Sequence, residues 1–99
     1  MQFVVTGYDG KDPEAPARRQ AAREAHLARA EKLYGEGGLL YAAALLDEQG
    51  GMAGSVLIMS FESEKALREQ WLKDEPYVTG DVWRDIRIEP CKVPGFCPQ

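Results

Sequence analysis

The chain has 99 residues, of which 44% are hydrophobic and 28% are charged, and its formal net charge is -4. This length suits a single domain, and no apolar run reaches the roughly 20 residues that cross a bilayer. The acidic balance argues against nucleic acid as a partner, because binding to phosphates needs an excess of lysine and arginine on one face. We therefore expect one domain over residues 1–99, with a core to residue 92, an irregular tail over 93–99, and no nucleic-acid or membrane partner.

The first predicted helix carries four arginines interleaved with glutamates. These arginines are Arg18, Arg19, Arg23 and Arg29. Charges of both signs at spacings of three and four residues are typical of a solvated helix face. We therefore assign these arginines to solvent rather than to a binding surface.

Two cysteines, Cys91 and Cys97, lie near the C-terminus, and the chain has one histidine. Two thiols and one imidazole do not supply the four ligands of a structural zinc site, so no metal is expected. The N-terminal residues lack the layout of a signal peptide, which indicates a cytoplasmic protein with reduced thiols. A disulfide that closes the tail is the alternative, and it requires an oxidising compartment.

The first elements in chain order are a strand over residues 3–8 and a long helix. Asp12 is a suitable N-cap for this helix, Pro13 suits its first position, and the helix runs to Tyr34 before a glycine stop. Its inward stripe has helical spacing and consists of Ala22, His26, Ala30 and Leu33, widened by Leu27 and Tyr34. The single histidine therefore belongs to the inward face of the helix or to its edge.

Two apolar runs, over residues 39–46 and 55–61, predict a hairpin. The first run is so apolar that we expect the strand to be buried on both faces. Ser63 caps a second helix that runs to Lys73, and Pro76 ends this helix or marks an irregular segment.

Along residues 82–89, more apolar side chains at even positions alternate with more polar ones at odd positions, which predicts a half-exposed strand. In this pattern Trp83 points to the opposite face from Ile86 and Ile88. The resulting order of strand, helix, strand, strand, helix, strand is that of a ferredoxin-like α+β domain with an antiparallel sheet. Both helices cover one face of this sheet, so the other face has no cover within the chain. We expect a homodimer that packs sheet on sheet.

Four short segments carry a resemblance along nearly the whole chain: REAHLAR at residues 23–29, GLL at 38–40, GSVLI at 54–58 and DEPYV at 74–78. In this order and at these intervals they resemble the YCII-related (YciI-like) family. The resemblance implies a dimeric α+β barrel and an active site that pairs a histidine with an acidic residue. It also implies kinship with enzymes that eliminate chloride from chlorinated aromatic-derived substrates, and with muconolactone isomerases.

The sequence departs from the family pattern in three places. Ala42 to Ala44 stand where an Ala-Gly-Pro turn is common, which affects the close approach of backbone to ligand that glycine permits. Glu75 stands where an aspartate commonly precedes the proline, with Asp74 one step earlier. Thr79-Gly80 stands in place of an Ala-Gly pair.

Histidine is the side chain whose ordinary pKa lies nearest neutrality, and His26 is therefore the candidate general acid/base. An inward imidazole needs partners for its nitrogens, and a carboxylate on one of them fixes the tautomer. Glu75 and Asp74 are the catalytic candidates for that carboxylate, because Pro76 holds the local backbone extended. The alternative is a structural histidine that is bonded to backbone or to Tyr34 and serves packing.

Three further residues are candidates for substrate binding: Ser55, Asp47 and Tyr77. Ser55 lacks a nucleophile-elbow motif, so its expected role is to donate a hydroxyl hydrogen bond to a bound anion. Asp47 lies in the predicted hairpin loop and is also a third candidate partner for the histidine, with a solvated loop as the alternative. Tyr77, like Tyr41 and Trp83, lines a pocket or packs in the core or a dimer interface.

These residues predict a small cofactor-independent enzyme of the lyase or isomerase type that acts on a small acidic or aromatic-derived substrate. A non-catalytic dimeric module that binds a small metabolite in the same cleft is the alternative, and a subunit of a larger assembly is the third interpretation. The expected partners are a second copy of the chain, in a dimer or a higher oligomer, and a small-molecule ligand.

Overall fold

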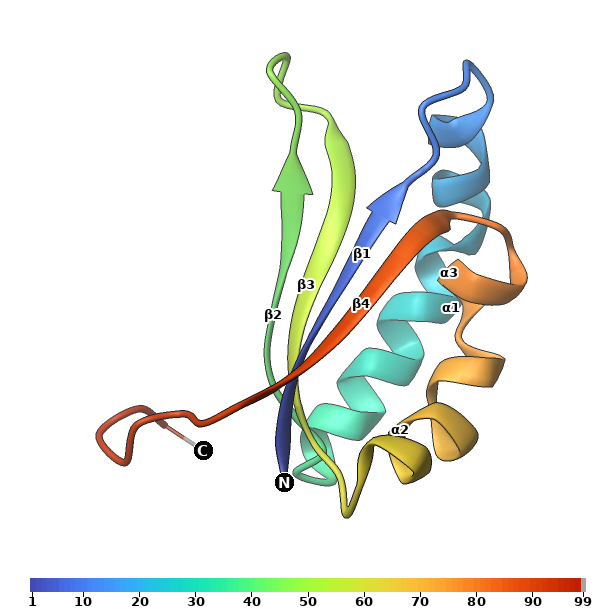
Figure 1. The fold of residues 1–99 in the computed structure, drawn as a ribbon. Helices are drawn as coiled ribbons and strands as arrows, with labels where there is room; N and C mark the ends of the chain where they lie inside the picture. The colour runs from blue at the N-terminus through green and yellow to red at the C-terminus, as the bar shows by residue number, and fades with distance from the viewer. Residues whose placement is uncertain (99) are drawn as a thin grey trace.

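The computed structural model describes residues 1–98, in which a four-stranded sheet carries all the helices on one face (Figure 1). The elements are β1 (Gln2–Asp9), α1 (Ala15–Gly35), β2 (Leu39–Leu46), β3 (Met52–Ser60), α2 (Glu64–Gln70), the 3-10 helix η1 (Leu72–Asp74), α3 (Pro76–Thr79) and β4 (Trp83–Cys91). The sheet is antiparallel with the strand order β2-β3-β1-β4. The predicted ferredoxin-like α+β order is confirmed. Gln99, the last residue of the predicted tail, lies outside the described residues.

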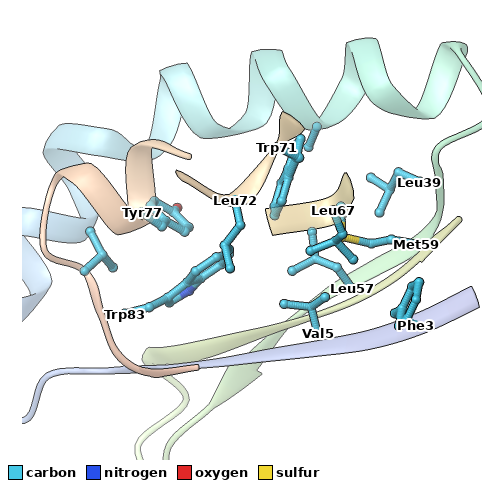
Figure 2. Close-up of a cluster of buried hydrophobic side chains, with 12 residues drawn as sticks. Phe3, Val5, Leu39, Leu57, Met59, Leu67, Trp71, Leu72, Tyr77 and Trp83 are labelled. Carbon is cyan, nitrogen blue, oxygen red and sulfur yellow. The ribbon is translucent and has the colours of Figure 1, made fainter. Parts of the chain in front are cut away.

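Alternation along the central strands separates a helix-facing set of side chains from an opposite set. Phe3 and Val5 of β1 pair with Met59 and Leu57 of β3, and none of these four side chains is more than 1% exposed. They pack against residues of the second half of the chain, among them Leu67, Trp71, Leu72 and Tyr77 (Figure 2). The core therefore lies between the sheet and the helices, and it fixes the distance at which α1 and α3 stand above the sheet.

Among residues 1–98, no helix lies over the opposite face of the sheet, which we call the uncovered face (Figure 1). The strand register places Val4, Thr6, Val56, Ile58 and Tyr41 on this face. Tyr41 is 73% exposed. The chain therefore presents apolar side chains on the side of the sheet where it has no second layer.

β2 is an edge strand, and the prediction that it is buried on both faces is wrong. Leu39 is its one buried residue, whereas Leu46 is 63% exposed. The physical reason is the topology: β2 pairs with β3 alone, and half of its side chains point to the uncovered face. An apolar run in a sequence predicts that a strand is shielded from water, but it does not identify which part of the chain or which partner would shield it.

α1 begins at Ala15, two residues later than Pro13. Asp12 is not its N-cap, because the Asp12 carboxylate accepts hydrogen bonds from Nη1 and Nη2 of Arg18 at 2.8 and 2.7 Å. The guanidinium holds the pKa of the Asp12 carboxyl well below its ordinary value. Glu14 occupies the N-cap position without a side-chain cap.

The inward stripe of α1 is narrower than predicted, and it extends further toward the N-terminus. Leu27 and Tyr34 are 45% and 64% exposed and do not belong to it. The buried residues of the helix are Ala15, Arg19, His26 and Ala30. The assignment of Arg19 to solvent is therefore wrong, because this side chain lies on the stripe that faces the sheet.

The helical segment after β3 consists of three short pieces instead of one helix to Lys73. Oγ of Ser63 accepts a hydrogen bond from the backbone N–H of Ala66 at 3.0 Å, which confirms the predicted cap, but α2 ends at Gln70. Pro76 opens α3 rather than ending a helix, because proline suits the first helical position. Glu75 caps α3 through its carboxylate.

The register between β1 and β4 shifts by one residue between Tyr8 and Asp9, and Asp9 pairs with Trp83. Arg84 is the additional residue, so the strand has a β-bulge there. Strict alternation sends Trp83 to the uncovered face, whereas the bulge turns it toward the helices, where it is 4% exposed. Its indole packs over Gly7, where any side-chain carbon would overlap with the ring.

Beyond β4, residues 92–98 have no regular secondary structure and lead away from the helices (Figure 1). Cys91 and Cys97 are free, half-buried thiols. No helix among residues 1–98 is long and apolar enough to span a membrane.

Candidate active site

The single histidine lies on the inward face of α1, beside the N-terminus of α3. Nδ1 of His26 is hydrogen-bonded to Oε1 of Glu75, whose side chain is fully buried. Glu75 also accepts the backbone N–H of Tyr77 at 3.2 Å, and Nη1 of Arg29 lies 3.4 Å from its Oε2. Because this carboxylate is surrounded by N–H groups, it acts as an acceptor, and His26 donates from Nδ1. In the neutral form of this imidazole, Nε2 then carries the lone pair.

Two aromatic rings fix the plane of the imidazole. Tyr77 stacks on His26 with ring centroids 3.9 Å apart, and Trp83 approaches it edge-on at 5.8 Å. Burial raises the pKa of the Tyr77 hydroxyl, so this group stays protonated at neutral pH. The orientation of His26 is therefore set by one carboxylate and two rings.

Arg19 lies about two helical turns before His26, on the same face of α1. Its Nη1 donates to both carboxylate oxygens of Asp9 at 2.8 Å, and its Nη2 donates to the Gly54 carbonyl and to Oγ of Ser55 at 3.2 Å. The side chains of Arg19 and Asp9 are 8% and 6% exposed. A buried ion pair of this kind persists because its charges are matched and hydrogen-bonded.

A pocket of about 210 Å³ lies between α1 and the β2–β3 hairpin. Its walls include Arg19, Arg23 and His26 of α1, Ser55 of β3, Tyr77 of α3 and Ala42 of β2. This volume is below the roughly 300 to 1,000 Å³ of pockets for drug-sized ligands. The pocket therefore suits a small molecule, and Arg23 in its wall favours a negatively charged one.

Four of the six predicted site residues come together around this pocket: His26, Glu75, Ser55 and Tyr77. Asp74 is exposed at the end of η1 and does not line the pocket. Asp47 is exposed in the hairpin turn, where its Oδ1 accepts the backbone N–H groups of Gln49 and Gly51 at 2.9 Å. Within residues 1–98, no three side chains of His, Cys, Asp or Glu are grouped so that they can hold a metal ion.

Sequence reasoning missed Asp9 and Arg19, and it placed Trp83 on the wrong face of its strand. The spacing of seven residues between Arg19 and His26 is a signal that places both side chains on one helix face. No comparable signal exists for Asp9 and Trp83, because their position depends on the shifted register between β1 and β4.

The family model of the YCII-related domain matches residues 1–92 of the chain. The chain belongs to the YCII-related family. An uncharacterised protein of Haemophilus influenzae is 36% identical, over 93% of this chain and 97% of that protein. Protein YciI of Escherichia coli is 34% identical, with the same coverage.

Among solved structures, the chain is similar to the 5-chloro-2-hydroxyhydroquinone dehydrochlorinase TftG of Burkholderia phenoliruptrix, in complex with 2,5-dihydroxybenzoquinone. The two are 25% identical with a TM-score of 0.81, over 93% of this chain and 94% of that one. The fold is thus the ferredoxin-like α+β fold of the dimeric α+β barrel proteins. In this member of the YCII-related family, the three alanines from Ala42 to Ala44 form part of the pocket wall.

Proposed function

We propose that this chain is a cytoplasmic, cofactor-independent enzyme of the lyase or isomerase type, with His26 as general acid/base and Glu75 as its positioning carboxylate. One observation carries the proposal: a fully buried carboxylate binds Nδ1 of an imidazole whose ring also lines the pocket. This arrangement favours the tautomer that leaves Nε2 as a base. General acid–base catalysis of this kind contributes about 10² to 10⁴ in rate.

In the proposed reaction an O–H or acidic C–H bond of the substrate breaks, and its proton moves to Nε2 of His26. The electron pair left behind expels a leaving group such as chloride, or forms an enolate that is protonated again at another carbon. Neither route requires an oxidant or a reductant. The likeness to TftG, a dehydrochlorinase of a hydroxyhydroquinone, supports an aromatic-derived substrate.

To test this proposal, turnover of 5-chloro-2-hydroxyhydroquinone and of a panel of hydroxyquinones and unsaturated lactones is measured in deuterated water. Released chloride and incorporated deuterium are both measured. We expect His26→Gln to lower the rate on any accepted substrate by about 10²- to 10⁴-fold, because the amide cannot take the proton.

The matched control is Glu24→Gln, which changes an exposed side chain of the same helix and should leave the rate unchanged. Full activity of His26→Gln would show that the assignment is wrong. Ligands that bind in the pocket but are never turned over would favour the non-catalytic binding module instead.

We also propose that the chain forms a homodimer through the uncovered face of its sheet. The support is the set of apolar side chains on that face, with Tyr41 73% exposed, and the similarity to proteins of the dimeric α+β barrel type.

Sedimentation of the wild-type protein should give the mass of a dimer, and Tyr41→Asp should shift it toward the monomer. Tyr34→Asp changes a tyrosine that is 64% exposed on α1 and should leave the dimer intact. Equal effects of the two substitutions would contradict the proposed interface.

A further inference from the structure

The hydroxyl of Ser55 has both of its acceptor positions occupied. Ser55 is 4% exposed, and its Oγ accepts hydrogen bonds from Nη2 of Arg19 and from Nε1 of Trp83, each at 3.2 Å. A hydroxyl oxygen has two lone pairs, and neither a guanidinium nor an indole N–H can accept a hydrogen bond in return. The Ser55 O–H therefore remains as a donor, and residues 1–98 offer it no acceptor.

A second unpaired donor belongs to Arg19. Its two terminal nitrogens are engaged by Asp9, Gly54 and Ser55, whereas its Nε is buried without a partner among the described residues. The side chain is 8% exposed, so bulk water does not solvate this N–H. Buried donors without acceptors are costly and rare in folded proteins.

Both unpaired donors belong to side chains that line the same pocket as His26. The positive charge of Arg19 is balanced by Asp9, so these donors sit in a corner that carries little net charge. Such a corner stabilises an oxygen that becomes negative during a reaction more than one that arrives fully charged. Arg23, which also lines the pocket, supplies the positive charge that attracts an acidic molecule.

We propose that Ser55 and Arg19 form an oxyanion-binding corner, and that the substrate is therefore a small phenol or enolisable carbonyl compound. This inference rests on the proposed function of the same pocket. When the substrate proton moves to Nε2 of His26, the electron pair of the broken bond is carried by the substrate oxygen. That oxygen accepts hydrogen bonds from the Ser55 O–H and from the Arg19 Nε–H.

The probe for this corner is 4-nitrophenol, because its phenolate and its neutral form have different absorption spectra. We expect the wild-type protein to lower the pKa of the bound phenol relative to the free one. Ser55→Ala should weaken phenolate binding by about tenfold or more, since it removes a hydrogen bond to a charged group. Nitrobenzene has no ionisable oxygen, and its affinity should be the same for both proteins.

The matched control is Ser60→Ala, which removes a hydroxyl from the same strand at a position that faces away from the pocket. Ser55→Ala also deprives Trp83 of its acceptor, so a second variant guards against a folding defect. Arg19→Lys keeps a cation beside Asp9 but removes the Nε–H, and it should weaken phenolate binding as well. Unchanged phenolate affinity in either variant overturns the proposal, as does a wild-type protein that binds nitrobenzene and 4-nitrophenolate equally.

The same titration on His26→Gln separates this inference from the proposed function. Preference for the phenolate should persist there, because the corner does not depend on the base. Turnover by the wild-type protein without any effect of Ser55→Ala on phenolate binding overturns the oxyanion corner alone. Phenolate preference without turnover of any substrate overturns the enzymatic function alone.

Discussion

Glu75→Gln is expected to lower the free energy of unfolding by about 3–5 kcal/mol, which is the range for breaking a buried ion pair. The carboxylate is fully buried and has His26, Arg29 and the backbone N–H of Tyr77 around it. A glutamine of the same size presents one acceptor oxygen, and its NH₂ group finds an acceptor there only if Nδ1 of His26 gives up its proton. Urea denaturation measures the loss.

The same substitution should allow His26 to adopt its second neutral tautomer. Because the chain has one histidine, the nitrogen NMR spectrum of the imidazole is unambiguous. We expect the wild-type protein to carry the proton on Nδ1 and Glu75→Gln to populate the other tautomer. Glu64→Gln is the control, because this exposed carboxylate pairs with Arg68 at 3.0 Å on the surface of α2, where such pairs contribute about 0–1 kcal/mol. A stable Glu75→Gln variant with an unchanged tautomer would contradict the dyad.

Arg19→Met should have an effect of similar size, about 3–5 kcal/mol, because it leaves the Asp9 carboxylate buried without its partner. Arg18→Met is a closely matched control. Arg18 likewise binds both oxygens of a carboxylate, here through its two Nη atoms, but the side chains of this pair are 23% and 35% exposed. Loss of this partly exposed pair is expected to cost much less, because solvent screens its charges.

A double variant checks the reason for this difference. Asp9→Leu combined with Arg19→Met removes both buried charges, and apolar replacements of similar volume often restore stability. We expect the double variant to unfold at a higher urea concentration than Arg19→Met alone. Equal costs for Arg18→Met and Arg19→Met would mean that burial does not distinguish the two arginines.

The strand and helix order could be predicted from the sequence because apolar periodicity and caps are local signals. Ser63 is the cap that its sequence context indicates, and His26 lies on the inward face of α1 as its spacing predicts. The contact between His26 and Glu75 joins residues 49 positions apart. The family resemblance, rather than periodicity, made this pairing predictable.

What could not be predicted depends on tertiary context. Arg19 looks like a surface arginine until Asp9 is placed opposite it, and Asp9 occupies that position because it ends a central strand. Asp12 has the local signature of an N-cap, but Arg18 competes for its carboxylate. In both cases a partner distant from the local motif decides where the charged group lies.

The bulge at Arg84 has a consequence for how this chain tolerates changes in length. A shift in register that closes the bulge, so that Arg84 pairs with Asp9, would restore strict alternation and rotate Trp83 to the uncovered face. Ser55 would then lose one of its two donors, and the sheet would gain an indole on its bare side. Deletion of Arg84 would instead leave Trp83 opposite Asp9 and facing the helices, so this strand should tolerate the loss of that residue better than the loss of the bulge geometry.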